Sequence, residues 1–197
     1  VFDHHASFGA ITGSLFEIEK AAKETGIRSC LCYEISDRDG MDKSREAIQE
    51  NVDFIKHALA DDSDMITGMM GMHASFTISD ETMERCAAMK PEGVGYHIHV
   101  AEGIEDLHAC LKDHGKRIID RLMDWNILGE KTLTAHCIYV NKHEMELLRD
   151  TNTMVVHNPE SNMGNACGCP PTMALVHKGI VTGLGTDGYT HDMMESW

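Results

Sequence analysis

The chain has 197 residues, 42% of them hydrophobic, and its 17 basic residues against 32 acidic ones give a formal net charge of −15. This length can bury a sizeable core and usually forms one domain. The negative charge argues against a nucleic-acid partner, because a phosphate backbone would be repelled, and no apolar run approaches the ~20 residues of a membrane span.

Short apolar segments alternate with longer amphipathic ones along the whole chain. The predicted strands are Val1–His5, Ile27–Glu34, Met65–His73, Gly93–Ala101, Thr132–Cys137, Thr153–His157 and Ile180–Thr186. The predicted helices between them are Ile11–Thr25, Asp42–Ala60, Ser79–Met89, Ile104–Trp125, Asn141–Arg149 and Thr172–Lys178. This alternation predicts an α/β fold with a parallel sheet and right-handed crossovers. A doubly wound open sheet is the alternative, although no Gly-rich phosphate fingerprint follows any strand.

Residues suited to helix ends stand at several of these boundaries. Ser79 and Asn141 are predicted N-caps, because their side-chain oxygens can accept from the first free backbone amides. Gly26 and Gly179 stand where helices should end.

The seven cysteines are scattered and include no CxxC pair, which argues against a structural zinc site. A reduced, cytoplasmic location is therefore expected. We interpret Cys167 and Cys169 as free thiols in a loop.

Three predicted strands end in residues that can bind a metal or move a proton. His97 and His99 lie two positions apart, so they share a face of their strand, and Glu102 follows at its end. His136 and Asp187 end two later strands. Taken alone, each has an ordinary interpretation as a hydrogen-bonded core histidine or a turn residue. Because parallel strands end at one edge, the ordered set predicts one metal site there.

Four segments then carry a resemblance to a known family. They are His99-Val100-Ala101-Glu102, Ala135-His136-Cys137, Val156 to Met163, and Gly185-Thr186-Asp187. Together they resemble the amidohydrolase superfamily, in particular the branch of aminohydrolases and chlorohydrolases that includes guanine, cytosine and adenosylhomocysteine deaminases. The segments from Asn158 to Asn165 and from Gly185 to Thr190 are similar to putative aminohydrolases of selenium metabolism, the SsnA group.

The resemblance implies a (β/α)8 TIM barrel with one divalent metal, zinc or alternatively iron, at the C-terminal ends of its strands. It implies that His99 and Asp187 bind the metal, that Glu102 shuttles a proton, and that Asp187 accepts the proton of the attacking water. His136 would face that water or the substrate and steady developing charge. His73, His157 and Asn162 would contact the substrate, while His97 lies deeper and supports the site.

The chain departs from the family pattern at one point. The family's first two metal ligands form an HxH at the end of barrel strand one, and no such strand is found here, since His4-His5 lacks the spacing. We therefore expect residues 1–197 to be a barrel fragment covering strands two to eight, without strand one and the C-terminal region. Such a fragment should bind metal poorly and be inactive by itself.

The implied activity is hydrolytic deamination at a C–N bond of an N-heterocycle or cyclic amidine. The alternatives are a chlorohydrolase, a cyclic amidase of the same superfamily, or a non-catalytic barrel paralogue. Two-metal cyclic amidases carry a bridging lysine at strand four, but no Lys lies between Lys56 and Lys90, which favours a single metal. We expect a small-molecule substrate, no nucleic-acid or membrane partner, and allow for a homodimer of the full-length protein.

The segment Asn158–Pro171 is polar and Gly-rich before it closes with two prolines, which predicts a loop. Loops after barrel strands carry substrate contacts. We expect Asn162 to hydrogen-bond groups that shape the site and His157 to face the barrel mouth.

Overall fold

The computed structural model describes all 197 residues, and the chain divides into two compact units. The first unit comprises Val1–His73 with Thr77–His97, and the second comprises Ala74–Phe76 with Ile98–Trp197. None of the helices combines the length with the apolar character that crossing a membrane requires.

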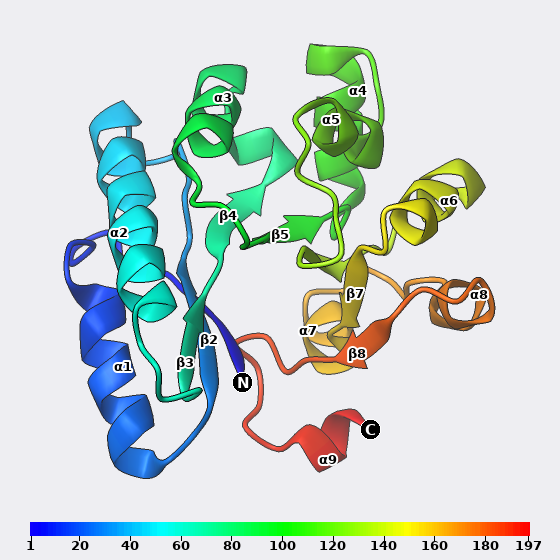
Figure 1. The fold of residues 1–197 in the computed structure, drawn as a ribbon. Helices are drawn as coiled ribbons and strands as arrows, with labels where there is room; N and C mark the ends of the chain where they lie inside the picture. Colours follow the sequence, from blue (N-terminus) through cyan, green and yellow to red (C-terminus); the bar gives the residue numbers. More distant parts are fainter. The chain divides into compact units, whose positions relative to one another are not determined.

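A parallel sheet organises the first unit. Strands β1 (Phe2–His5), β2 (Ser29–Tyr33) and β3 (Ile66–Gly68) pair in that order (Figure 1). The chain then enters β4 (Met70–Ala74), whose Met70 amide donates to the carbonyl of Gly95, just before β5 (Tyr96–Val100). The predicted strand over 65–73 is thus two strands, because its first half pairs with β2, whereas its second half pairs with β5 and keeps only an isolated bridge between Met72 and Ile35.

One glycine in this sheet is required by a close approach of two strands. A Cβ built on Gly71 of β4 would lie 2.3 Å from the carbonyl oxygen of Tyr33 at the end of β2. Real Cβ atoms do not come this close to backbone, so only glycine fits between the two strands.

Helices cover this sheet. Helices α1 (Ser14–Thr25) and α2 (Met41–Leu59) pack against β2, and α2 also packs against β3 (Figure 1). A short 3-10 helix, η1 (Ser75–Thr77), precedes α3 (Asp80–Met89). Two predicted helix ends are confirmed, because the Ser79 side chain accepts from the Thr82 amide and Gly26 ends α1 with a φ of 73°.

The second unit continues the parallel pattern. Strands β6 (Leu133–His136), β7 (Met154–His157) and β8 (Thr182–Leu184) pair in that order. The amide of Cys137, just after β6, donates to the carbonyl of Val100 at the end of β5. The ends of β5, β6, β7 and β8 therefore belong to one edge, which is where the sequence predicted the site.

The helices of the second unit differ from expectation in two places. The predicted helix over 104–125 is divided into α4 (Ile104–His114) and α5 (Ile118–Asp124), because Gly115 adopts a left-handed φ of 67° and ends the first. The predicted loop over 158–171 contains α7 (Pro159–Gly164), which the fixed φ of a first-turn proline favours.

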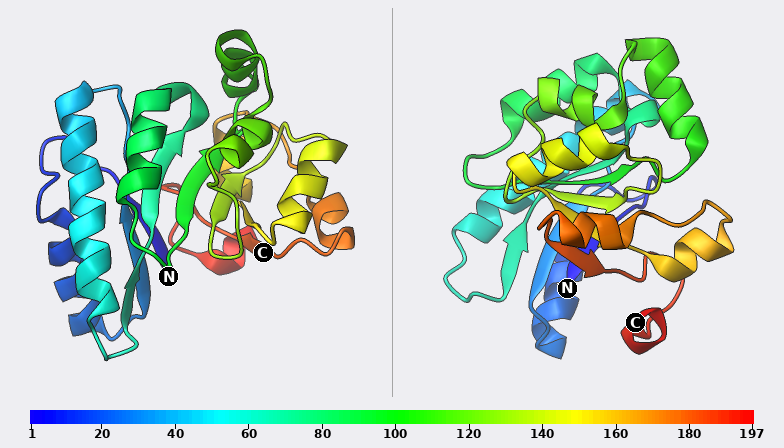
Figure 2. Two further views of the ribbon diagram at one scale, coloured as in Figure 1. Left: turned by 45° about the horizontal axis from the view of Figure 1, so that its top comes forward. Right: turned by 90° about the vertical axis from the view of Figure 1, so that its right-hand side faces the viewer.

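Helices α6 (Lys142–Asp150) and α8 (Thr172–His177) follow the prediction, whereas α9 (Met193–Ser196) was not predicted. Helix α6 begins with a reciprocal capping box between Asn141 and Glu144, and α5 packs against it. Helix α8 lies against β8 (Figure 2), and Gly179 follows it with a φ of 79°. The short helix α9 follows the turn after β8.

Candidate active site

Three of the predicted site residues come together in the second unit. Glu102, His136 and Asp187 present ligand atoms that all lie within 4.8 Å of one another. The ring of His99 stacks on that of His136, with centroids 5.6 Å apart and planes inclined by 28°. The structure thus gathers the ends of β5, β6 and β8, although His99 joins through ring stacking rather than as a fourth member of the 4.8 Å cluster.

The backbone turns sharply where these side chains emerge. Ala101, His136, Cys137 and Asp187 all have positive φ, between 49° and 69°. L-residues rarely adopt this region, and each such residue costs about 1–3 kcal/mol unless its surroundings hold it. Here they do, because the Cys137 amide donates to Val100 and the Ile138 amide donates to Ala101. Strained backbone is thus concentrated at the strand ends that carry the candidate site.

Two asparagine amides determine which nitrogen of His136 carries the proton. The ring is fully buried, and its Nδ1 lies 2.8 Å from Oδ1 of Asn162, an oxygen that can only accept. The Nδ2 of Asn158, which can only donate, lies 3.5 Å from Nε2 of the same ring. Both contacts place the proton on Nδ1 and leave a lone pair on Nε2.

The lone pair of His136 faces two carboxylates. Its Nε2 lies 3.6 Å from Oε2 of Glu102 and 3.8 Å from Oδ2 of Asp187. Neither carboxylate has a lysine or arginine partner. The site therefore concentrates negative charge around one buried imidazole, an arrangement that suits a cation or a protonated intermediate.

The second histidine of the site is held neutral. Nδ2 of Asn162 donates to Nδ1 of His157 at 3.3 Å, so one amide serves both rings. Burial lowers the pKa of His157, and a proton bound by His136 would lower it further. A neutral His157 with Nδ1 occupied keeps its ring proton on Nε2, as a hydrogen-bond donor.

Asp187 is fixed through both of its oxygens. The Ser161 hydroxyl donates to Oδ2 at 2.6 Å, and the Gly188 amide donates to Oδ1 at 2.8 Å. Burial works to raise the pKa of Asp187. The Ser161 and Gly188 hydrogen bonds, with His136 and His99 nearby, outweigh burial and hold this pKa below its usual value. The carboxylate is thus a stable anion.

Glu102 has a neighbour that the sequence did not predict. The thiol of Cys167 lies 3.8 Å from its Oε1. Burial raises the pKa of Cys167, and the charge of Glu102 raises it further, so the group remains a thiol and can donate. Cys167 is a free thiol, as the sequence predicted, and it also contacts a carboxylate of the candidate site.

The segment after β7 positions most of these polar groups. Pro159 begins α7, and the first turn of this helix presents Ser161 towards Asp187 and Asn162 towards His136. Asn158 needs a glycine at position 185, because a Cβ on Gly185 would lie 2.3 Å from Oδ1 of Asn158. The sequence drew attention to the asparagines of this segment, but only the fold shows which ring or carboxylate each one meets.

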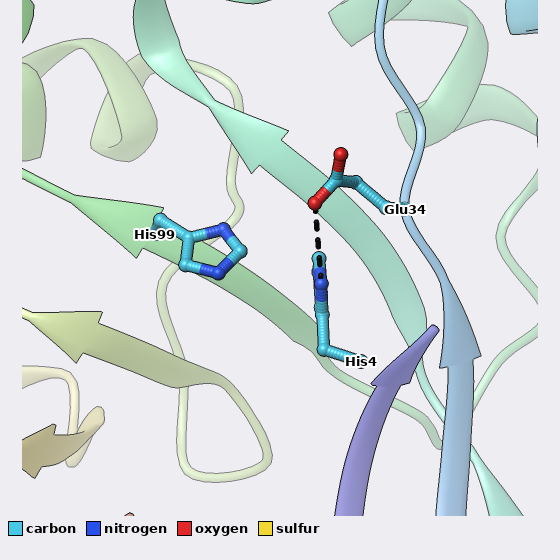
Figure 3. Close-up of side chains that lie close together, drawn as sticks. All are labelled: His4, Glu34 and His99. Carbon is cyan, nitrogen blue, oxygen red and sulfur yellow. Dashed lines mark ion pairs between the residues drawn. The ribbon is translucent and has the colours of Figure 1, made fainter. Parts of the chain in front are cut away.

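The other predicted site histidines belong to the first unit. Nδ1 of His73 lies 2.7 Å from the hydroxyl of Thr77. His97 is buried and packs edge-on against the ring of His4, with centroids 4.6 Å apart. His4 in turn lies 3.7 Å from the Glu34 carboxylate (Figure 3). The role predicted for His73 in substrate contact stays a prediction.

Comparison with known proteins relates the chain to the amidohydrolases. The model of the amidohydrolase family matches residues 5–196. A 5-methylthioadenosine/S-adenosylhomocysteine deaminase of Desulfitobacterium hafniense is 32% identical over 176 residues, which are 89% of this chain and 40% of that protein. The chain therefore spans less than half the length of this relative.

Solved structures support the same fold. A zinc-bound adenosine deaminase of Xanthomonas campestris superposes with a TM-score of 0.82 at 22% identity, covering 90% of this chain and 42% of the other. The zinc complex of the atrazine chlorohydrolase of Arthrobacter aurescens gives 0.79 at 20% identity, covering 94% and 44%. These likenesses confirm the expected α/β barrel fold for the part that the chain covers. With the family model matching almost its whole length, the chain belongs to the amidohydrolase family.

Proposed function

We propose that the protein is a metal-dependent hydrolase that deaminates an N-heterocycle or cyclic amidine. The observation that carries this proposal is the cluster of Glu102, His136 and Asp187 within 4.8 Å, held by asparagine amides at the ends of parallel strands. The relative named as a 5-methylthioadenosine/S-adenosylhomocysteine deaminase supports an aminated purine as the substrate class.

The donor set fits a divalent ion. Carboxylate and imidazole are the groups that bind zinc in hydrolases, and the two carboxylates near His136 lack cationic partners. We propose that His99 and Asp187 contribute to holding the ion, with zinc favoured and iron as the alternative. When bound, such an ion lowers the pKa of a water molecule to about 7 and so supplies a nucleophile at neutral pH.

The residues of the chain would handle the protons. Asp187, kept ionised by Ser161 and Gly188, accepts a proton from the attacking water. Glu102 would pass the other proton of the attacking water to the ring nitrogen of the substrate. The proton held by Asp187 would then be transferred to the amino group, which leaves as ammonia while the ring carbon gains a carbonyl oxygen. His136 can take a proton only at Nε2, since Asn162 occupies Nδ1. The resulting imidazolium, which lies near the carboxylates of Glu102 and Asp187, would stabilise the negative charge that develops on the substrate.

Substrate recognition would fall to His157 and Asn162, with His73 as a further candidate from the family resemblance. A neutral His157 offers a ring N–H to an acceptor on the heterocycle. We further propose a small-molecule substrate, a cytoplasmic location consistent with seven free cysteines, and no nucleic-acid partner at this net charge.

The alternatives are separated by their products. Ammonia release identifies deamination, chloride identifies dehalogenation, and a new carboxylate identifies ring opening. The chlorohydrolase likeness, at 20% identity, speaks for the fold alone. A non-catalytic paralogue would release none of these products.

The decisive variant is Asp187→Asn in the intact protein. It should abolish measurable turnover, because a positioned proton acceptor contributes about 10²–10⁴-fold to rate. Ammonia release, zinc content and thermal unfolding should be measured together, with the exposed Asp150→Asn as a control that retains activity. A folded, metal-loaded Asp187→Asn protein that still turns over substrate would refute the mechanism.

A further inference from the structure

Ser161 makes a contact that helix formation does not require. It lies in the first turn of α7 with 1% of its surface exposed, yet its hydroxyl points out of the helix and donates to Oδ2 of Asp187. The 2.6 Å distance is typical of a short hydrogen bond from a hydroxyl to an anion. Since the Gly188 amide binds the other oxygen, the carboxylate cannot rotate without losing a partner.

A second amide gives this contact a direction. Nδ2 of Asn165 lies 3.4 Å from the Ser161 hydroxyl oxygen and can only donate to it. The backbone amide of Asn165 also donates to the Ser161 carbonyl, which keeps the two residues one turn apart. A hydroxyl that already accepts from Asn165 directs its single proton towards Asp187. The order of donation therefore runs from Asn165 to Ser161 to Asp187.

We propose that Ser161, oriented by Asn165, is a positioning residue that holds the Asp187 carboxylate for metal binding and proton acceptance. The inference rests on the proposed function, because it assigns Asp187 to the metal. The strained backbone supports it, since Asp187 has a φ of 53° and needs outside partners to stay in place.

The test is the zinc affinity of the intact protein, measured by competition with a chelator. Loss of an outer partner of a metal ligand typically costs about 10–100-fold in affinity, and Ser161→Ala should fall in this range. Ser161→Thr keeps the hydroxyl and should recover most of the affinity. The control is Ser63→Ala, which removes an exposed hydroxyl of the first unit and should bind zinc as the wild type does.

A substitution at Asn165 tests the direction of the bond. In Asn165→Asp the new carboxylate accepts from the Ser161 hydroxyl and draws its proton away from Asp187. Zinc affinity should therefore fall as in Ser161→Ala, while the exposed position leaves thermal unfolding unchanged. At saturating zinc, the kcat of both variants should stay low and KM should be nearly unchanged, because the damaged group accepts a proton rather than binding substrate.

The outcomes separate this inference from the proposed function. Wild-type zinc affinity in a folded Ser161→Ala protein overturns the inference and leaves the function standing. If that variant does not fold, wild-type affinity in Asn165→Asp overturns it instead. A folded wild-type protein that binds no zinc overturns the proposed function, and the inference with it.

Discussion

The side chain of Asn162 connects the two histidines of the site through a single amide group. Its oxygen accepts from His136 and its nitrogen donates to His157, and the residue is almost fully buried. A neutral amide orients both rings without adding charge to a site that already holds two carboxylates.

Replacing this amide should damage catalysis more than metal binding. We expect Asn162→Ala to lower kcat/KM by about 10–100-fold with zinc content retained, because the rings lose their orientation while the ligands remain. Steady-state kinetics and metal analysis test this, with the neighbouring, exposed Met163→Ala as control. Unchanged activity towards the native substrate would mean that the segment after β7 is only a connector.

The clustering of Glu102, His136 and Asp187 could be predicted from the sequence, whereas the hydrogen-bond partners of these residues could not. Glu102, His136 and Asp187 each end an apolar run, and parallel strands bring such ends together. The contact of Ser161 with Asp187 joins residues 26 positions apart through the path of α7, and that of Cys167 with Glu102 spans 65 positions. No periodicity in the chain encodes which side chain of a loop faces which carboxylate.

At the scale of elements, the differences from prediction arise at changes of direction. The strand over 65–73 and the helix over 104–125 were each predicted as one element, because their apolar patterns continue through the break. Gly115 ends α4 through its positive φ, and β3 gives way to β4 where β5 becomes a second neighbour of the chain. The apolar pattern indicates which residues are buried, but a strand or helix ends where its hydrogen-bonding partners end.

Asp106 ties three of these elements together. It lies in the first turn of α4, and its carboxylate accepts from the amide of Ala101, just after β5, and from that of Phe76 in η1. Burial raises the pKa of Asp106 to about 6, against the lowering effect of those two amides. The folded protein therefore binds this proton more tightly than the unfolded chain does.

The raised pKa of Asp106 predicts the direction in which the free energy of unfolding changes with pH. Between about pH 4 and pH 6 the folded state holds the proton and the unfolded state does not, so the free energy of unfolding falls as pH rises. The full effect is about 3 kcal/mol, from a shift of roughly two units at 1.36 kcal/mol each. The free energy of unfolding of the wild type, measured with urea, should therefore exceed that of Asp106→Asn by more near pH 4 than near pH 6. A difference that grows with pH would contradict this assignment.

For the whole molecule, the dominant property is its charge. A formal net charge of −15 over 197 residues makes like-charge repulsion a general destabilising contribution. Family membership and fold followed from motifs spread over nearly the whole chain, while the substrate remains a proposal because the chain spans 40% of its deaminase relative.

Salt should consequently stabilise the chain at neutral pH. Raising NaCl from about 20 mM to about 300 mM shortens the screening length to below 10 Å, so the thermal midpoint should increase at pH 7. Near the isoelectric point of about 5.2 the net charge vanishes, and the same change in salt should have little effect. A midpoint that falls with salt at pH 7 would show that attractive ion pairs outweigh the repulsion.

The shared amide of Asn162 also limits how protons can be distributed in the site. Turning it by 180° would present its NH₂ group to Nδ1 of His136, which would then have to accept and would carry its proton on Nε2. The same turn would present the oxygen to Nδ1 of His157, which would then have to donate. The two rings therefore change tautomer together. Two independent neutral histidines would have four combinations of tautomers, whereas this coupled pair has two. Asn158, donating to Nε2 of His136, favours one of the two states, so a residue outside the pair selects the tautomer of both rings.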